Sequence, residues 1–353
     1  MDKDLPKTEK WSAHLQAHNQ HLETIQKFKA TYSRPLLEET KEALEWIHHS
    51  KTEELVASEL GHSTPWEHLH PNLPGPFLSL GAHLWVLIIG NDNYLSVPAL
   101  GGCINDAHLV NDYVKKYLQV PEDHIVLLEN ACHDEMVDAL YNLRDNKTIP
   151  FGDNILIYYS GYGSAYNYTQ GQWTLCVGAI CPTNRGCGAC DISERELDFI
   201  LSELCAAKGP KVTFISDCCY SGSSLRSVRE DAVFRVVPPL RDEYGADDLD
   251  HMLKLAMDNP RRCSNIDIFS KNWKRELASY VQLEPGESTI EMGVGPGNRR
   301  HGLFTFAVIK VLESEEGRGA TYEGVIQLIG HLRKSQMPKA IGIRKDSLLW
   351  FTQ

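Results

Sequence analysis

Four short, almost wholly apolar runs, with helical stretches between them, constrain the fold of this chain most. The runs are His83–Gly90, His124–Asn130, Asn154–Gly161 and Lys211–Cys218. Apolar runs of this length are typical of strands buried on both faces of a parallel sheet. The helical patterns are Asn105–Leu118, His133–Arg144 and Ser193–Ala207. Strands alternating with helices predict an α/β fold, in which a central, mostly parallel sheet carries helices on both faces.

The chain divides into two predicted parts. Residues 1–80 show amphipathic helical spacing and then a proline-rich break, which predicts a helical N-terminal extension. Residues 81–353 are predicted to be one domain, with a large part (81–222), a linker (223–275) and a smaller part (276–353). The linker is expected to be exposed, because it is acidic, contains prolines and lacks periodicity. Within the smaller part we predict a strand at Tyr280–Pro285 and helices at Leu303–Leu312 and Tyr322–Leu332.

Charge and hydropathy exclude several classes of partner. The formal net charge of −12 disfavours nucleic acid and anionic membrane surfaces, and it favours basic partners or substrates. No apolar run reaches the roughly 18 residues needed to span a bilayer. The N-terminus has no apolar segment of the kind that secretory signals contain, so a cytoplasmic location is expected. The ten cysteines are then expected to be reduced thiols.

Chemistry is expected at the carboxyl ends of the strands, where functional groups gather in doubly wound sheets. Two of these ends read YSGYGS, at Tyr159–Ser164, and SDCCYSGS, at Ser216–Ser223. A tight turn there would expose the sulfur of Cys219 and aim its backbone N–H at a developing oxyanion. The alternative is that Cys218 and Cys219 are simply small buried residues, as free cysteines often are.

A wider pattern favours the catalytic interpretation. These two blocks occur together with LIIGNDNYLSVPALGGCINDA at Leu87–Ala107 and HGLFTFAVIKVL at His301–Leu312. In this order and spacing, over Trp85–Phe351, the chain resembles the caspase-domain cysteine peptidases, specifically metacaspases of the fungal type. The resemblance implies a caspase–haemoglobinase fold and an endopeptidase that cleaves after arginine or lysine. It does not extend to the first eighty residues.

The resemblance also assigns roles to individual residues. It implies that Cys219 is the nucleophile and that the backbone N–H groups of Gly163 and Cys219 form the oxyanion hole. The residues expected to line the pocket for the side chain before the scissile bond are Cys103, Asp106, Ser160 and Asp217. Two carboxylates in such a pocket would select arginine or lysine through charge-assisted hydrogen bonds. Alternatively, Asp106 stabilises the helix that follows it and Asp217 is a turn residue.

One position departs from the family pattern. Tyr162 stands where the general-base histidine is expected, and Tyr220 fills the place of a second family histidine. A tyrosine with a pKa near 10 holds its proton too tightly to accept one from a thiol at neutral pH. We therefore predict an impaired homologue that acts as a binding or regulatory module, for instance on active metacaspases. The alternatives are a functioning endopeptidase with an unorthodox base and a purely structural scaffold; His301 and His133 are the histidines considered as substitutes.

No cofactor and no metal are predicted. Calcium-binding metacaspases carry clustered acids near the start of the helix before the nucleophile strand, whereas Arg195 follows Glu194 here, and an arginine is incompatible with a hard-cation site. Asp191 and Glu194 are expected to be helix N-terminal charges. Cys176, Cys181, Cys187 and Cys190 could hold structural zinc, but reduced loop cysteines are the favoured interpretation. Arg226, Arg229, Arg261 and Arg262 are either self-cleavage sites or ordinary solvated arginines.

Overall fold

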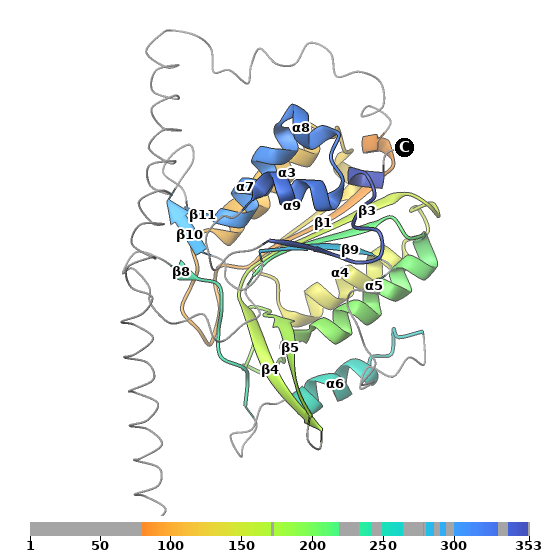
Figure 1. The fold of residues 1–353 in the computed structure, drawn as a ribbon. Helices are drawn as coiled ribbons and strands as arrows, with labels where there is room; N and C mark the ends of the chain where they lie inside the picture. Colours follow the sequence, from red (N-terminus) through yellow and green to blue (C-terminus); the bar gives the residue numbers. More distant parts are fainter. Residues whose placement is uncertain are drawn as a thin grey trace, which may run out of the picture. The chain divides into compact units, whose positions relative to one another are not determined.

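The computed structural model describes residues 80–170, 173–218, 233–241, 249–263, 278, 280–285, 290–293, 300–330 and 338–351. They form a central six-stranded sheet in the order β12-β9-β7-β3-β1-β2 (Figure 1). The strands are β1 (Leu84–Gly90), β2 (Ile125–Glu129), β3 (Asn154–Ser160), β7 (Val212–Asp217), β9 (Val281–Glu284) and β12 (Lys339–Ile341). All pairings are parallel except that of the edge strand β12 with β9. The sheet confirms the predicted fold class.

The strand β1 shows why these apolar runs become central strands. All seven of its residues are buried. Because successive side chains point to opposite faces of a sheet, Leu87 and Ile89 enter one hydrophobic core whereas Val86 and Ile88 enter the other. A strand with an apolar residue on both faces is stable only when helices cover both sides.

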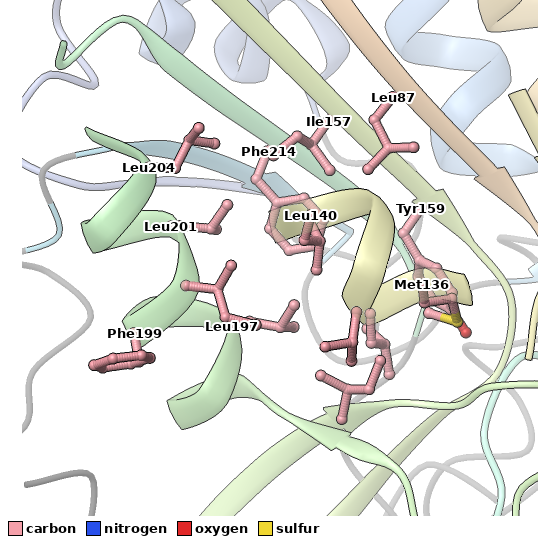
Figure 2. Packing of buried hydrophobic residues seen from close by; sticks show 14 of the residues in the cluster. Leu87, Met136, Leu140, Ile157, Tyr159, Leu197, Phe199, Leu201, Leu204 and Phe214 are labelled. Carbon is pink, nitrogen blue, oxygen red and sulfur yellow. The ribbon is translucent and has the colours of Figure 1, made fainter. Parts of the chain in front are cut away.

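Helices provide that cover on each face (Figure 1). One face carries α4 (His133–Asp145), α5 (Glu194–Lys208) and α6 (Leu249–Met257), whose apolar residues join the first core. Figure 2 shows this core, with leucines of α4 and α5 packed against strand residues Leu87, Ile157 and Phe214. The other face carries α3 (Cys103–Lys116), α7 (Leu303–Glu313) and α9 (Tyr322–Ile329). Short elements complete the domain: η1 (Glu122–His124), α8 (Glu315–Arg318) and η4 (Leu349–Phe351).

Two small sheets lie beside the central one. The first joins β4 (Gly163–Gln170), β5 (Trp173–Ile180) and β6 (Ile192–Ser193), and the β4–β5 pair extends away from the main sheet (Figure 1). The second joins β8 (Val233–Phe234), β10 (Ile290–Gly293) and β11 (Arg300–Gly302). Neither sheet was predicted. Most of their strands are short or carry polar residues and so lack the apolar signal that marks the central strands, whereas β5 contains the apolar run Leu175–Ile180, which was overlooked.

The predicted exposed linker is wrong in two of its segments. Arg235, Val236 and Val237 are buried. The helix α6 also buries Leu249, Met252, Leu253 and Ala256. Residues 235–237 are buried against distant parts of the chain, which local composition does not reveal. The helical spacing of the buried α6 residues, in contrast, was a local signal that was overlooked. The boundary predicted near residue 80 falls at the start of the described residues and stays a prediction. No described helix is long and apolar enough to cross a membrane.

Candidate active site

The parallel register brings two of the predicted residues together at the carboxyl edge of the sheet. Gly90, the last residue of β1, pairs with Ser160 at the end of β3, and Ser160 pairs with Asp217 at the end of β7. Ser160 and Asp217 are both fully buried. The edge of the sheet that was expected to carry chemistry therefore presents a hydroxyl and a carboxyl group side by side.

The start of α3 brings Asp106 to the same edge. Asp92, in the loop after β1, accepts hydrogen bonds from the backbone N–H groups of Cys103 at 2.9 Å and Ile104 at 3.2 Å, and thereby caps the helix. Gly90 allows close packing, since a Cβ there would lie 2.8 Å from the Cys103 carbonyl oxygen. Asp106, in the first turn of α3, thus reaches Ser160. The Ser160 hydroxyl lies 3.4 Å from Asp106 Oδ2. We call Asp106, Ser160 and Asp217 the carboxylate site.

An arginine of the same chain fills the carboxylate site. The Arg235 Nη2 lies 2.6 Å from Asp106 Oδ2, and its Nη1 lies 3.1 Å from Asp217 Oδ2. Nη1 also donates to the Ser160 hydroxyl at 2.6 Å. None of the three charged side chains has any solvent-exposed surface. The site is therefore built to hold a guanidinium, and in this structure it does so.

The smaller part of the domain closes the site with backbone donors at the start of α7. Gly302 N donates to Asp106 Oδ2 at 2.8 Å, and Thr305 donates to Asp217 Oδ2 through its backbone N–H and its hydroxyl. Negative charge at a helix N-terminus is favourable because the unpaired N–H groups and the helix dipole both face it. A Cβ at position 302 would lie 2.2 Å from Asp217 Oδ2 and 2.7 Å from Arg235 Nη1, so only glycine fits.

The charges of the site are not fully balanced by Arg235. Burial raises the pKa of Asp217, and the nearby Asp106 carboxylate adds to the rise, whereas Arg235 and the bonds from Thr305 oppose it. Asp217 Oδ1 has no hydrogen-bond partner within the part of the chain that the structure describes. His301 Nδ1 lies 3.0 Å from Asp106 Oδ1, so a protonated imidazole would supply a second positive charge.

Tyr162 lies in an apolar cluster beside the site. Its neighbours in this cluster are Leu100, Cys103, Cys181 and Val237, with Tyr94 and Val97 packed against them. The Tyr94 ring lies 4.9 Å from the Tyr162 ring, and the Tyr94 hydroxyl accepts from Tyr162 N at 2.8 Å. Burial raises the pKa of Tyr94. Tyr162, at the position expected for the general base, is therefore held in place by hydrophobic packing.

Gly163, the predicted oxyanion donor, already donates its backbone N–H. Its partner is the Arg235 carbonyl oxygen at 3.0 Å, and the Gly163 carbonyl accepts from Val237 N at 2.9 Å. Arg235 therefore contacts the predicted site through both its side chain and its backbone.

The structure brings together Asp106, Ser160 and Asp217, whereas Cys103 lies in the neighbouring cluster with Tyr162. Cys219, the predicted nucleophile, and Tyr220 lie outside the described residues. Cys218, immediately before the nucleophile position, is described and is fully buried. The functional roles given to these residues from sequence stay predictions.

Sequence reasoning missed Arg235 and Thr305 as parts of the site, and it considered His301 only as a possible substitute base. A signal for Arg235 existed: it is the one charged residue in the run Val233–Val237, which is otherwise apolar. A lone charge in such a run indicates a buried ion pair, but it does not name the partners. Of the two histidines considered as substitute bases, His301 contacts Asp106 of the site, whereas His133 contacts Asp134 at the start of α4.

The residues considered as possible metal ligands make other contacts or lie apart in exposure. Asp191 is not a helix N-terminal charge: it is buried and bound by Arg185 Nε and Nη2, both at 2.8 Å, and by the Tyr166 hydroxyl at 2.7 Å. The expectation for Asp191 was wrong because its carboxylate pairs with Arg185, six positions earlier in the same loop, whereas Glu194 does lie in the first turn of α5. Cys181 is buried whereas Cys176 and Cys187 are exposed. No group of three or more potential metal ligands occurs among the described residues.

The arginines weighed as cleavage sites fall into two groups. Arg226 and Arg229 lie outside the described residues. Arg261 is bound to Asp138 at 3.0 Å and Asp145 at 2.6 Å, and the Arg262 guanidinium lies 4.2 Å from the centre of the Phe199 ring. Both arginines anchor the segment after α6, although the ion pairs of Arg261 are partly exposed to solvent.

The fold and the site define an α/β protein with a buried acidic site at the carboxyl edge of its sheet. A family model described as "Caspase domain" matches residues 83–340, so this chain belongs to the caspase-domain family. No curated protein matches the sequence. A crystal structure of a protein from Geobacter sulfurreducens is similar in fold, with a TM-score of 0.51 and 15% identity over 73% of this chain and 92% of the other.

Proposed function

We propose that this caspase-domain protein recognises arginine or lysine side chains in basic protein segments, and that it is an impaired homologue of cysteine endopeptidases with that specificity. The observation that carries the proposal is the guanidinium of Arg235 between Asp106 and Asp217. A guanidinium matches such a site better than other side chains because its planar fork donates to two carboxylates at once. An acidic side chain would add a third negative charge.

The impairment follows from the residue at position 162. A cysteine peptidase needs a group that accepts the thiol proton and later protonates the leaving amine. Histidine suits this task because its pKa lies near neutral pH, whereas that of tyrosine lies near 10. Tyr162 also packs among apolar side chains. The chain would then bind basic segments without efficient turnover, as a binding or regulatory module, for instance one that acts on active relatives.

A second candidate function rests on His301. Its Nδ1 lies 3.0 Å from Asp106 Oδ1, and an aspartate held on one ring nitrogen is how many enzymes orient a histidine base. With His301 as the base, the chain would be a functioning endopeptidase that cleaves after arginine or lysine.

The test compares initial rates of arginyl-amide hydrolysis at neutral pH. The variants are the parent, Tyr162→His, and Tyr162→His combined with Cys219→Ala. We expect Tyr162→His to raise the rate by at least about 100-fold, the lower end of general acid–base contributions, and the added Cys219→Ala to abolish the gain. An aspartyl amide is the matched substrate control and should not be hydrolysed.

Two results would change the proposal. Hydrolysis by the parent that His301→Gln removes would favour the second candidate. If Tyr162→His binds arginyl and aspartyl peptides equally, the acidic site is not a recognition site and the proposal fails.

A further inference from the structure

The carboxylate site is occupied by the chain itself, and the occupant lies there in extended form. Residues on both sides of Arg235 pair with other strands. Before it, Val233 and Phe234 of β8 pair antiparallel with Glu291 and Ile290 of β10. After it, Val236 forms a parallel bridge with Gly163 at the start of β4.

These pairings give Arg235 three kinds of contact that a bound peptide would make. Its guanidinium enters the carboxylate site, with contacts of 2.6 Å to Asp106 and 3.1 Å to Asp217. Its carbonyl oxygen accepts from Gly163 N at 3.0 Å. The residues before it add a strand to β10. Strand addition of this kind is a common mode of peptide binding, in which backbone bonds supply affinity and side-chain pockets supply specificity.

We propose that residues 233–237 are an internal ligand, which occupies the site where an external basic segment binds and must leave before that segment can enter. This inference rests on the proposed function. An arginine with a purely structural role would need only its ion pairs. Here the backbone on both sides of Arg235 is also held, and one of the donors is Gly163, the residue predicted to face a substrate carbonyl.

The internal ligand also defines which external segments fit. Val236 and Val237, which follow Arg235, are only 7% and 6% exposed. Val237 packs in the apolar cluster that contains Tyr162, Cys103 and Leu100. The site therefore accepts a basic residue followed by two aliphatic residues in an extended conformation. A charged residue two positions after the arginine would be buried among apolar side chains, which is costly.

The test measures the binding of a fluorescent peptide, Ala-Val-Phe-Arg-Val-Val, which copies residues 232–237. A matched peptide has glutamate in place of arginine. Three chains are compared by fluorescence anisotropy: the parent, Arg235→Gln, and Arg241→Gln, which changes an exposed arginine further along the same segment. We expect Arg235→Gln to bind the arginine peptide at least tenfold tighter than the parent does. Arg241→Gln should bind as the parent, and no chain should bind the glutamate peptide.

A second measurement needs no variant and guards against misfolding of Arg235→Gln. Hydrogen exchange of the parent is followed with and without saturating arginine peptide. Displacement should speed exchange in residues 233–241, including Val237 N–H, which donates to Gly163. Exchange in β1, on the far side of β3, is the internal control and should not change.

The outcomes separate this inference from the proposed function. If the parent and Arg235→Gln bind the arginine peptide equally and selectively, the proposed function stands and the internal ligand is refuted. Peptide binding that leaves exchange of residues 233–241 unchanged refutes it as well. If neither folded chain prefers arginine over glutamate, the proposed function fails and the inference falls with it.

Discussion

Two arginines from neighbouring segments of the chain attach those segments to the domain in different ways. Arg235 lies between two carboxylates with no exposed side-chain surface on any partner. Arg261 binds Asp138 and Asp145 on α4, but its own side chain is 27% exposed and those of its partners are 62% and 46% exposed. The chemistry is the same in both places, a guanidinium with two carboxylates, and only the burial differs.

Burial decides what each cluster can do. A solvated ion pair contributes little, since water competes for both charges and salt screens them. A buried pair gives little net stability either, but the loss of one partner is severe because an uncompensated charge remains. The Arg261 pairs are therefore expected to contribute little to stability, whereas the Arg235 cluster loses much stability when its cation is removed. A site of that kind favours the exchange of one cation for another over remaining empty.

Removal of Arg235 should give the largest effect. We expect Arg235→Leu to lower the free energy of unfolding by about 3–5 kcal/mol, because Asp106 and Asp217 would stay buried without a counter-charge. Chemical denaturation at pH 7 measures the loss. Adding Asp106→Asn should recover part of it, since the amide oxygen still accepts from Gly302 N. A loss below about 1 kcal/mol, typical of exposed pairs, would show that the two arginine clusters do not differ.

The same variant should depend on pH in a defined direction. Burial already raises the pKa of Asp217, and loss of Arg235 removes the largest of the influences that oppose this rise. The folded variant would then bind a proton more readily than the unfolded chain. Its loss in free energy of unfolding relative to the parent should therefore shrink as the pH falls from 7 towards 4. A deficit that grows on acidification would mean that the carboxyl group stays ionised without Arg235.

A methyl group at position 302 should give the next largest effect. Gly302→Ala places a Cβ against Asp217 and Arg235 at distances below any normal contact, and overpacking typically costs about 1–3 kcal/mol. The matched control is Gly319→Ala, at a position with no atom within 4 Å of the added Cβ and a φ of −102°. Thermal unfolding of both variants is the measurement. Equal melting temperatures would show that the carboxylate site adapts to the added volume.

The smallest effect is expected for Arg261→Ala, below about 1 kcal/mol at pH 7 because its partners are solvated. The hydrogen bond from Arg144, with a smaller contribution from Arg261, lowers the pKa of Asp145 to about 2. A lowered folded-state pKa means that the contribution is complete above about pH 4 and is lost as the pH falls towards 2. The difference in free energy of unfolding between parent and variant should therefore be constant from pH 7 to pH 5 and decrease below pH 4. Lys254→Ala, on the exposed face of α6, should show no such fading.

The sequence predicted the central sheet because its signal is local. The run that became β1 is apolar at every position, and burial on both faces is its simplest explanation. The meeting of Asp106, Ser160 and Asp217 was also predictable, since parallel strands end at one edge and α3 begins there. Each of these inferences needed only the neighbours of a residue in the chain.

Arg235 was not predictable by the same reasoning. Its partner Asp106 lies 129 positions away, and the composition around it suggested an exposed linker. Arg235 is positioned by buried carboxylates that two other segments of the chain contribute. The sequence of any one segment does not reveal this balance of charge. The β4–β5 hairpin was missed for a different reason. β4 alternates polar and aromatic residues, and the apolar run Leu175–Ile180 of β5 was interpreted as part of a cysteine-containing loop.

That Arg235 and Asp217 belong to one chain, 18 positions apart, has a consequence for affinity. A tethered ligand acts at an effective concentration, which for short flexible connections is on the order of millimolar. An external peptide therefore competes with a partner that dilution cannot remove. Cutting the chain between the two residues would leave Arg235 connected to the site only through the longer segment that leads to β9, which pairs with β7 in the central sheet.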